Sequence, residues 1–374
     1  MKNDSDPFSA SDHTLMARAL RLAGRGLNTT QPNPRVGCVI ARDGEMIGEG
    51  WHERAGEPHA EVFALRAAGE RVRGATACVT LEPCAHHGRT PPCADALIEA
   101  GIARVVAACE DPNPKTAGVG LRRLREAGIE VQVGLMSETA REINRGFFSR
   151  LERGRPWVRV KLAMSLDGRT ALGSGASKWI TGEAARADVQ RWRARSSAIL
   201  AGAGTARADD PRLTVRLPKG EAFEPPLRVV FDPKLDALPT DAHLLDGSAP
   251  TLVLHAPDAK GRDQRYARAE LAAVPVDARG RFDLVEAMRL LAQREVNELQ
   301  VEAGPSLCGA LFDAGLVDEL LLYVAPVLLG DLARPLLHLP LLAEMSRRKS
   351  LRVIDQRMLG ADIRLLLRPT QAAG

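Results

Sequence analysis

One histidine, one glutamate and two cysteines in the first third of the chain have the types and order of a catalytic zinc site. His59 and Glu61 are separated by a single residue, and Cys84 and Cys93 follow. Imidazole and thiolate are ligands that Zn²⁺ prefers, and three of them leave a fourth tetrahedral position open to a water whose pKa falls to about 7. Glu61 can move a proton of that water without binding the metal. We therefore predict a zinc site at His59, Cys84 and Cys93, with Glu61 as the catalytic residue.

The spacing of the two cysteines departs from the general pattern of this chemistry. Zinc-dependent base deaminases carry H-x-E followed by P-C-x-x-C, whereas eight residues separate Cys84 from Cys93 here. The longer loop can still return Cys93 to the metal, and it brings His86, His87 and Arg89 beside it, where cationic groups can hold a phosphate. A structural zinc with His86 or His87 as its fourth ligand is the alternative, and it leaves Glu61 without a role.

The remaining histidines and cysteines favour no second metal site. Cys38, Cys78 and Cys109 lie in apolar runs, and we expect them to be buried strand residues. His52 begins a sequence like H-E-x-x-H, but Gly56 stands where a metalloprotease needs its second histidine.

Composition places these residues in an ordinary globular chain. At roughly 150 residues per domain, 374 residues predict two to three domains. The formal charge of +4 is spread along the chain and aromatic residues make up 4%, which argues against a nucleic-acid-binding surface. The first twelve residues lack the pattern of a secretory signal, and the longest apolar run, 320–330, is too short to span a membrane. We expect a soluble, cytoplasmic protein with reduced cysteines.

The first half reads as a layered α/β domain. Asp43-Gly44 between two β-type runs predicts an antiparallel hairpin of 36–41 and 46–51. Strands are then expected at 76–81, 105–109 and 130–133, and helices at 58–68, 92–100 and 121–127. This alternation predicts a largely parallel sheet after the hairpin.

A short polar segment broken by glycine and proline, 153–156, is a plausible domain boundary, and the α/β rhythm restarts after it. Strands are expected at 157–164, 198–202, 227–231, 251–255, 299–302 and 320–324, and helices at 183–194, 284–293 and 306–314. A closing antiparallel hairpin is expected from 351–357 and 362–367.

One glycine-containing turn in this half could bind an anion. Segment 301–309 is a β-type run that ends in a Gly-Pro turn and opens a helix, whose N-terminal amides favour a group such as a cofactor diphosphate. A simple strand-to-helix turn explains the segment equally well. The other glycine clusters, 118–120, 173–175 and 202–205, are weaker.

Several segments together resemble the bifunctional deaminase/reductase family of riboflavin biosynthesis. In the first half these are PNPRVG at 32–37, GEPHAE at 56–61, TLEPCAHHGRTPPC at 80–93 and DPNP at 111–114. The longer cysteine spacing is characteristic of that family. In the second half they are KLAMSLDG at 161–168, SKWIT at 177–181, ADDPRLTVR at 208–216 and EAGPSLCG at 302–309.

The resemblance implies a fold and a pair of reactions. Residues 1–152 would form a cytidine-deaminase-like three-layer α/β/α domain, and residues 153–374 a dihydrofolate-reductase-like α/β domain. The first would use Zn²⁺ to deaminate 2,5-diamino-6-(5-phosphoribosylamino)pyrimidin-4(3H)-one. The second would use NADPH to reduce the ribosyl group, giving 5-amino-6-(5-phosphoribitylamino)uracil. A homo-oligomer is common in the family.

The resemblance also implies contacts, carried over position by position. Substrate contacts in the deaminase half would be Asn33, His52, His86, Arg89, Asp111 and Asn113. The NADPH site would be lined by Ala163, Trp179, Thr205, Asp209, Gly304, Pro305, Ser306, Leu307, Cys308, Gly309 and Ala310. Substrate contacts in the reductase half would be Lys161, Ser177, Arg193, Leu213, Arg216 and Glu302. Pro233 stands where some relatives carry a small hydroxyl residue facing the cofactor.

Two other functions stay open. One is a zinc deaminase for cytosine, guanine or tRNA adenine joined to an unrelated second domain; the Arg89 loop and the second-half segments argue against it. The other is a zinc-stabilised nucleotide-binding module without catalysis, which would give Glu61 no role.

Overall fold

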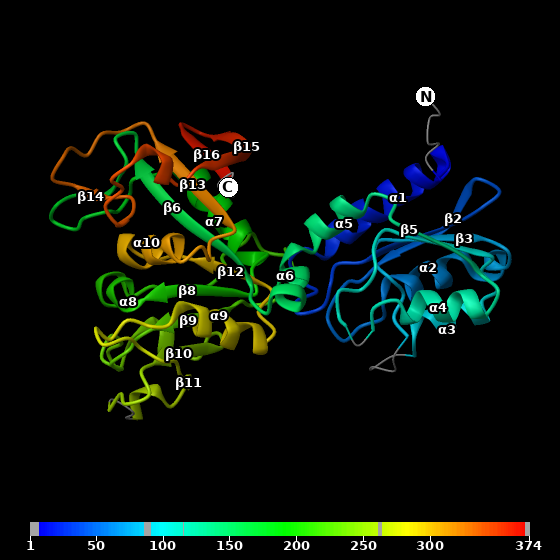
Figure 1. Ribbon diagram of the computed structural model, residues 1–374, viewed down its shortest axis with the longest axis horizontal. Helices are drawn as coiled ribbons and strands as arrows, with labels where there is room; N and C mark the ends of the chain where they lie inside the picture. Colours follow the sequence, from blue (N-terminus) through cyan, green and yellow to red (C-terminus); the bar gives the residue numbers. More distant parts are fainter. Residues whose placement is uncertain (1–6, 86–90, 115, 261–263, 371–374) are drawn as a thin grey trace. The chain divides into compact units, whose positions relative to one another are not determined.

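The protein is described from a computed structural model that covers residues 7–85, 91–114, 116–260 and 264–370 (Figure 1). It divides into two compact units, Met1–Arg153 and Gly154–Gly374. No helix of the described chain is both long enough and apolar enough to cross a bilayer.

The first unit is built on a five-stranded sheet with the order β2-β1-β3-β4-β5. Its strands are β1 (Gly37–Arg42), β2 (Glu45–Trp51), β3 (Thr76–Val79), β4 (Arg104–Ala107) and β5 (Glu130–Val133). Its helices are α1 (Ala10–Ala23), α2 (Ala60–Ala68), α3 (Cys93–Glu99), α4 (Val119–Glu126), α5 (Ser137–Ile143) and α6 (Arg145–Arg153), with 3-10 turns at Gly24–Gly26 and Gly69–Val72. The predicted hairpin pairs antiparallel, and β3, β4 and β5 run parallel.

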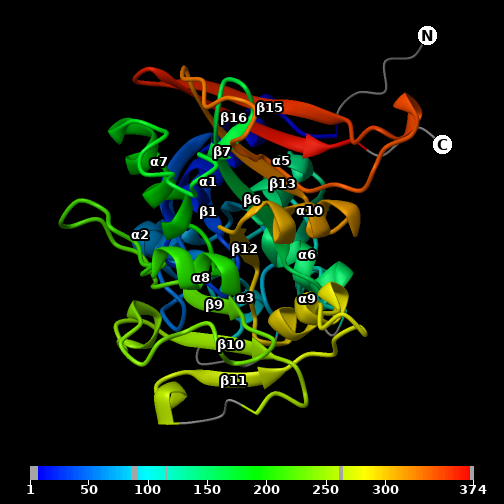
Figure 2. The ribbon, with the colours of Figure 1, turned by 90° about the vertical axis from the view of Figure 1, so that its left-hand side faces the viewer.

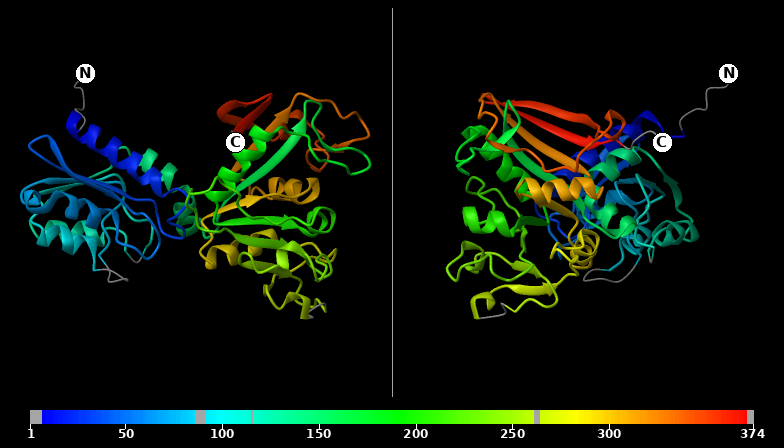
Figure 3. Two further views of the ribbon diagram at one scale, coloured as in Figure 1. Left: turned by 180° about the vertical axis from the view of Figure 1, so that it is seen from behind. Right: turned by 60° about the vertical axis from the view of Figure 1, so that its left-hand side comes forward.

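Alternation along the strands sorts side chains onto two covered faces, which makes three layers. Cys38 and Ile40 of β1 pack with α2, α3 and α4. Val39 and Ala41 of the same strand pack with α1, α5 and α6. Figure 3 shows α1 and α5 on one side of this sheet and α3 and α4 on the other. The predicted α/β/α layering is confirmed, and so is the burial of Cys38, Cys78 and Cys109.

Two glycines on β2 bring α2 close to the sheet. A Cβ added to Gly48 would lie 2.4 Å from the carbonyl oxygen of Ala64, and one added to Gly50 would lie 2.7 Å from that of Ala60. Only glycine therefore permits this separation. The close packing places the first turn of α2, with His59 and Glu61, over the end of the sheet.

Helix α1 is not predicted from the sequence, and its stability depends on polar groups at its start. Ser9 and Asp12 form a capping box, and Arg104 of β4 donates two hydrogen bonds to the Asp12 carboxylate at 2.7 and 2.9 Å. Asp12 is buried. Chiefly because of the Arg104 hydrogen bonds, the pKa of Asp12 is lowered to about 2.

The second unit has a nine-stranded sheet with the order β11-β10-β9-β8-β12-β6-β13-β16-β15, which Figure 2 shows from β11 at the bottom to β15 at the top. The strands are β6 (Trp157–Ser165), β8 (Ala198–Gly202), β9 (Leu227–Phe231), β10 (Thr251–His255), β11 (Glu270–Ala273), β12 (Glu298–Val301), β13 (Glu319–Ala325), β15 (Leu351–Leu359) and β16 (Asp362–Pro369). All neighbours are parallel except at the β13–β16–β15 end. A small ladder joins β7 (Arg169–Ala171) to β14 (Arg334–Pro335).

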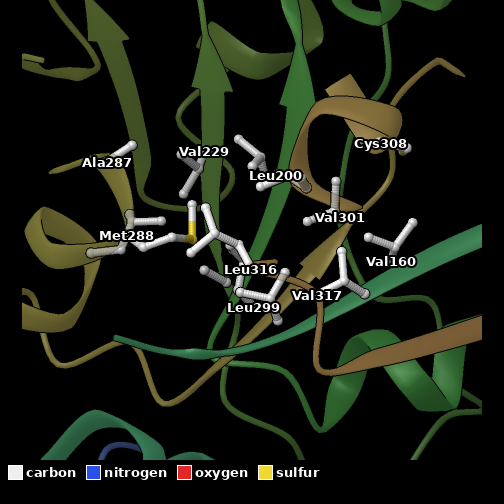
Figure 4. Close-up of a cluster of buried hydrophobic side chains, with 14 of the residues drawn as sticks. Val160, Leu200, Val229, Ala287, Met288, Leu299, Val301, Cys308, Leu316 and Val317 are labelled. Carbon is white, nitrogen blue, oxygen red and sulfur yellow. The ribbon is translucent and has the colours of Figure 1, made fainter. Parts of the chain in front are cut away.

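Helices cover this sheet and enclose its main core. They are α7 (Glu183–Ala194), α8 (Ala203–Asp209), α9 (Leu284–Gln293) and α10 (Pro305–Asp313), with 3-10 turns at His243–Leu245, Gln264–Tyr266 and Met345–Arg347. Figure 4 shows Leu200, Val229 and Val301 of the central strands packed with Met288 of α9, with Cys308 of α10 at the edge of the same cluster. The predicted α/β class of this half is confirmed.

Most expected elements are found, and several have the expected bounds. Segments 183–194, 198–202, 227–231, 251–255 and 284–293 are as predicted. β3 ends at Val79 and β4 at Ala107, two residues before the predicted ends, although single backbone hydrogen bonds such as Glu82 to Cys109 continue beyond them. Besides α1, the sequence does not predict α5, α6, α8, β7, β11 or β14; glycines 202 and 204 make the start of α8 resemble a turn.

Asp12→Asn tests the anchoring of α1. We expect the free energy of unfolding at pH 7 to fall by about 1–3 kcal/mol, because Arg104 loses a buried charged partner. Since the folded-state pKa of Asp12 lies below its ordinary value of 3.8, this stabilisation is present above about pH 4 and is lost as the pH falls through about 2. Urea unfolding at pH 7 and pH 3 measures both effects. Asp43→Asn, at a carboxylate 94% exposed, is the control and should change stability by less than about 0.5 kcal/mol.

Candidate active sites

Three elements of the first unit bring the predicted zinc ligands together. His59 is the residue before α2, Cys93 is the first residue of α3, and Cys84 lies on the loop after β3. Their ligand atoms all lie within 4.8 Å of one another. The Nδ1 atom of His59 is 3.3 Å from Sγ of Cys93 and 3.5 Å from Sγ of Cys84.

These separations fit a tetrahedral zinc site. Zn–N and Zn–S bonds of about 2.0 and 2.3 Å at tetrahedral angles place nitrogen and sulfur about 3.5 Å apart. The Cys93 amide donates to Sγ of Cys84 at 3.3 Å, which orients that sulfur. The donor set and its spacing therefore suit Zn²⁺ with one open position.

The environment stabilises a thiolate at Cys84. Hydrogen bonding from the Cys93 side chain is the main cause that lowers the pKa of Cys84 to about 4, although burial opposes it. The pKa of Cys93 is raised above its usual value, because its thiol donates that hydrogen bond to Cys84 and because it is buried. The hydrogen bond with Cys84 also raises the pKa of His59. Since a thiolate is the metal-binding form of cysteine, the site is prepared for a cation.

Glu61 lies in the first turn of α2 and is 3% exposed. Its Oε2 atom is buried and has no hydrogen-bond partner among the described residues. Burial raises the pKa of Glu61 to about 7. A buried carboxylate oxygen without a partner costs free energy unless a ligand satisfies it, so this atom marks a place for water or substrate.

His52 and Asn33 are hydrogen-bonded to each other, and the His52 ring lies next to that of His59. The His52 ring meets the Pro58 carbonyl through Nδ1 and the Asn33 amide through Nε2, both at 3.1 Å. Because a carbonyl only accepts, Nδ1 carries the proton and Nε2 accepts from Asn33. Burial lowers the pKa of His52, in agreement with a neutral ring. The ring stands edge-on to His59, with centroids 5.3 Å apart.

Two of the other predicted contacts of this half, Asp111 and Asn113, lie on the loop after β4. Asp111 and Asn113 form a turn in which the Asn113 amide donates to the Asp111 carboxylate at 2.8 Å. The Asp111 amide donates in turn to Glu82, at 3.0 Å. Glu82 was not predicted as a site residue, although it stands two positions before Cys84. His86 and Arg89 lie outside the described residues.

The second unit presents helix N-termini at one edge of its sheet. β8 and β12 are parallel neighbours, so α8 and α10, which follow them, begin at the same edge. Gly202 and Gly304 precede these helices, and no side chain caps either one. A Cβ added to Gly304 would meet nothing within 4 Å. The open backbone at the start of α10 can therefore approach an anionic group such as a diphosphate.

Predicted NADPH contacts are distributed around this edge. Ala163 lies on β6, Thr205 and Asp209 on α8, and Trp179 is 70% exposed on the segment before α7. Gly304, just before α10, is exposed, and so are Ser306 and Ala310 on the helix. Cys308 is buried, and its thiol donates a hydrogen bond to the Ala303 carbonyl. Gly309 lies against the backbone of His338. A Cβ added to Gly309 would be 2.0 Å from the carbonyl oxygen of His338. Cys308 and Gly309 thus face the protein interior.

Two predicted substrate contacts of the second unit pair with each other. Nε and Nη2 of Arg193 donate to the two oxygens of Glu302, both at 2.7 Å. The charge of Arg193 keeps the pKa of Glu302 at about 2, against the effect of burial. Nη1 of Arg193 also holds the Thr214 carbonyl. This last bond ties α7 to segment 212–216, which carries two more predicted contacts, Leu213 and Arg216.

Lys161 lies close to this pair. Burial lowers the pKa of its ammonium group; Glu302 opposes that shift and Arg193 adds to it. Its Nζ atom is 5.6 Å from the centre of the Tyr323 ring. Ser177 lies on the segment between β7 and α7, and the carbonyl of Pro233 accepts a hydrogen bond from Ala256.

Comparisons with known families match each half of the chain. Residues 9–109 match the family described as cytidine and deoxycytidylate deaminase zinc-binding region. Residues 156–360 match the family described as RibD C-terminal domain.

Full-length relatives were also found. The chain is 49% identical over 366 residues to riboflavin biosynthesis protein RibD of Escherichia coli K12, covering 95% of this chain and 99% of that protein. It is 49% identical over 373 residues to RibD of Haemophilus influenzae, covering 97% and 98%.

Two solved structures share the fold over both halves. Acinetobacter baumannii RibD (form 1) is 44% identical with a TM-score of 0.89, covering 96% of this chain and 99% of that one. A Thermotoga maritima protein described as a diaminohydroxyphosphoribosylaminopyrimidine deaminase/5-amino-6-(5-phosphoribosylamino)uracil reductase is 33% identical with a TM-score of 0.84, covering 96% and 99%.

Metal analysis tests the ligand set. We expect one zinc per chain, and we expect Cys84→Ala and Cys93→Ala each to weaken zinc binding by more than about tenfold, because each removes a ligand outright. Elemental analysis after dialysis against a chelator gives the zinc content. Cys78→Ala is the matched control, because that buried cysteine lies outside the cluster. Equal loss of zinc from the control would contradict this ligand set.

Proposed function

The chain belongs to the RibD family of bifunctional riboflavin-biosynthesis enzymes, and from that premise we propose a substrate and a set of working residues for each unit. The first unit deaminates 2,5-diamino-6-(5-phosphoribosylamino)pyrimidin-4(3H)-one. The second reduces the ribosyl group of the product with NADPH, which gives 5-amino-6-(5-phosphoribitylamino)uracil. The division of labour follows the two compact units, with the boundary at Arg153–Gly154.

The observation that carries the deaminase assignment is the Oε2 atom of Glu61, which is buried without a hydrogen-bond partner among the described residues and lies beside a three-ligand cluster. Zinc held by His59, Cys84 and Cys93 would supply the acidity that makes water nucleophilic near neutral pH. Glu61 accepts a proton of the attacking water and delivers it to the departing amino group, so that the C2–O bond forms and the bond from C2 to the amino nitrogen breaks. Ammonia leaves, C2 becomes a carbonyl carbon, and the other proton of the water ends on the adjacent ring nitrogen. The raised pKa of Glu61 suits a group that both takes and gives a proton.

In the first unit, the residues around the metal site position the substrate. Asn33 and the neutral His52 are held rigidly by each other and by the Pro58 carbonyl, which suits them to orient a polar ring. We assign Asp111 and Asn113 to the same substrate, and His86 and Arg89 to its phosphate, because cationic side chains bind phosphate.

In the second unit, NADPH would supply the hydride, and the chain's own residues would bind and orient both partners. The exposed positions at the start of α10, together with Ala163, Trp179, Thr205 and Asp209, line the cofactor site. Opening of the sugar ring turns the C1′–N bond of the substrate into a C=N bond. Lys161 approaches this bond and polarises it, so that C1′ can accept the hydride and the nitrogen a proton, with Glu302 keeping the ammonium in place. Arg216 holds the phosphate, because a guanidinium matches a phosphate with two parallel hydrogen bonds. Arg193, whose Nε and Nη2 atoms pair with Glu302, is assigned to the same substrate through its remaining N–H groups. Ser177 and Leu213 complete the substrate contacts.

Assembly and compartment follow from two further observations. Strand β15 is one edge of the sheet and exposes large apolar side chains: Val353 and Met358 are 53% and 62% exposed. Such a surface suits a second copy of this chain, so we propose a homo-oligomer. All six cysteines are free, in keeping with a reducing cytoplasmic location.

Glu61→Gln tests the deaminase. We expect ammonia release to fall by about 10²–10⁴-fold, because the amide can no longer accept the proton, while zinc content stays at the wild-type level. Ammonia and zinc are measured on the same preparation. The exposed Glu53→Gln is the control and should leave both unchanged. An active Glu61→Gln variant would exclude this mechanism.

Lys161→Met tests the reductase, since methionine keeps the length of the side chain without its charge. With the deaminated pyrimidine as substrate, we expect NADPH oxidation to slow by about 10²-fold, as for the loss of one donor that stabilises developing negative charge. Ammonia release by the first unit should not change. Lys219→Met, at an exposed lysine, provides the control. Wild-type NADPH oxidation by Lys161→Met would remove this residue from the reaction.

A further inference from the structure

Glu82 is a buried carboxylate surrounded by backbone amides. It is 5% exposed. Its Oε2 atom accepts hydrogen bonds from the amides of Asp111 and Gly118, at 3.0 and 2.9 Å. Its Oε1 atom accepts from Gly120 at 2.8 Å and Leu121 at 3.3 Å. One side chain thus satisfies four donors in segment 111–121, two of which belong to the first turn of α4, where a negative charge is favourable.

The backbone of the same region is fastened at two other points. The Glu82 amide donates to the Cys109 carbonyl at 2.9 Å, which continues the β3–β4 pairing beyond the ends of both strands. A Cβ added to Gly120 would lie 1.9 Å from the carbonyl oxygen of Pro83, so the start of α4 rests directly on the residue before Cys84. Together, these two contacts fix residues 82–83 relative to residues 109 and 120.

On its other side, this segment is joined to the metal ligands. Cys84, two residues after Glu82, accepts the Cys93 amide on its Sγ and the Ala94 amide on its carbonyl oxygen, at 3.3 and 3.1 Å. The turn of Asp111 and Asn113 is joined to Glu82 through the Asp111 amide. Glu82 therefore stands between the cysteine that holds the metal and the turn assigned to the substrate.

We propose that Glu82 is a positioning residue of the deaminase, which fixes the Asp111–Asn113 turn at a set distance from Cys84. This inference rests on the proposed function, since it assigns the turn to the pyrimidine substrate. The four hydrogen bonds of its carboxylate all come from backbone amides, so Glu82 acts through the backbone that it holds. Because the turn contacts the substrate equally in the ground state and the transition state, its displacement raises KM much more than it lowers kcat.

Steady-state kinetics of Glu82→Gln test the proposal. Glutamine keeps the length of the side chain but turns an NH₂ group toward two of the four donors, so the turn is released. We expect KM for the diaminopyrimidine substrate to rise at least tenfold, kcat to change less than threefold and zinc content to stay at the wild-type level. Glu82→Asp, which keeps both acceptor oxygens, should give an intermediate KM.

Gly120→Ala provides an independent variant, because it disturbs the contact with Pro83 and leaves Glu82 intact. We expect the same rise in KM. Gly24→Ala is its matched control, since an added Cβ there meets nothing within 4 Å. Asp12→Asn is the control for general loss of stability, because its buried carboxylate bonds to Ser9 and Arg104 instead. Neither control should change KM. An unchanged KM in Glu82→Gln, with kcat and zinc lost in proportion to folded protein, would show a merely structural residue.

Amide hydrogen exchange tests the hydrogen bonds without any substrate. In the wild-type chain the amides of Asp111, Gly118, Gly120 and Leu121 should be protected. In Glu82→Gln the one remaining oxygen can accept from only one of the two pairs, so at least two of these amides should exchange at least tenfold faster, while the Cys93 amide keeps its rate. Unchanged exchange at those four positions would overturn the proposal. A wild-type enzyme that releases no ammonia from the diaminopyrimidine would instead refute the proposed function.

Discussion

The first unit depends on holding one nitrogen and two sulfurs at separations that suit a tetrahedral metal site. His59, Cys84 and Cys93 come from the start of one helix, a loop and the start of another helix, so their spacing requires three segments to end at one place. Glycines on β2 allow α2 to approach the sheet, and the Cys93 amide holds the Cys84 sulfur. Burial then raises the pKa of Glu61 beside them. The buried carboxylate and the His59–Cys84–Cys93 cluster are thus products of the same packing.

The second unit must bind anionic molecules although the chain carries little net charge. Parallel strands β8 and β12 bring two helix starts to one edge, and the glycine before α10 leaves its backbone open. Beside this edge, Arg193 is balanced by Glu302 instead of being left to solvent. A paired arginine keeps its orientation at modest cost, because the partner offsets the penalty of burying the charge. The slight excess of positive charge is better understood as a few local phosphate contacts than as a binding surface.

How far the sequence predicted these features depends on the range of the interactions involved. The clustering of His59, Cys84 and Cys93 could be predicted because residue types and order of this kind are typical of zinc sites. Helices such as 183–194 and strands such as 251–255 could be found from local periodicity. Helix α1 was missed because its start is marked by Ser9 and Asp12 in a polar segment, and Asp12 bonds across the sheet to Arg104. The Arg193–Glu302 pair joins residues 109 positions apart, and the four amides at Glu82 return from a distant loop. Neither follows from spacing in one sequence.

The central claim is that two chemistries act in series, each in its own unit. It is tested most directly by giving the wild-type enzyme the phosphoribosylated diaminopyrimidinone while ammonia release and NADPH oxidation are followed together. The account predicts ammonia without NADPH, and one NADPH oxidised per ammonia released once NADPH is added. Removing zinc should stop both signals with this substrate, and the deaminated product should then restore NADPH oxidation alone. Ammonia release that requires NADPH, or NADPH oxidation from the diamino compound at full rate without zinc, would contradict it.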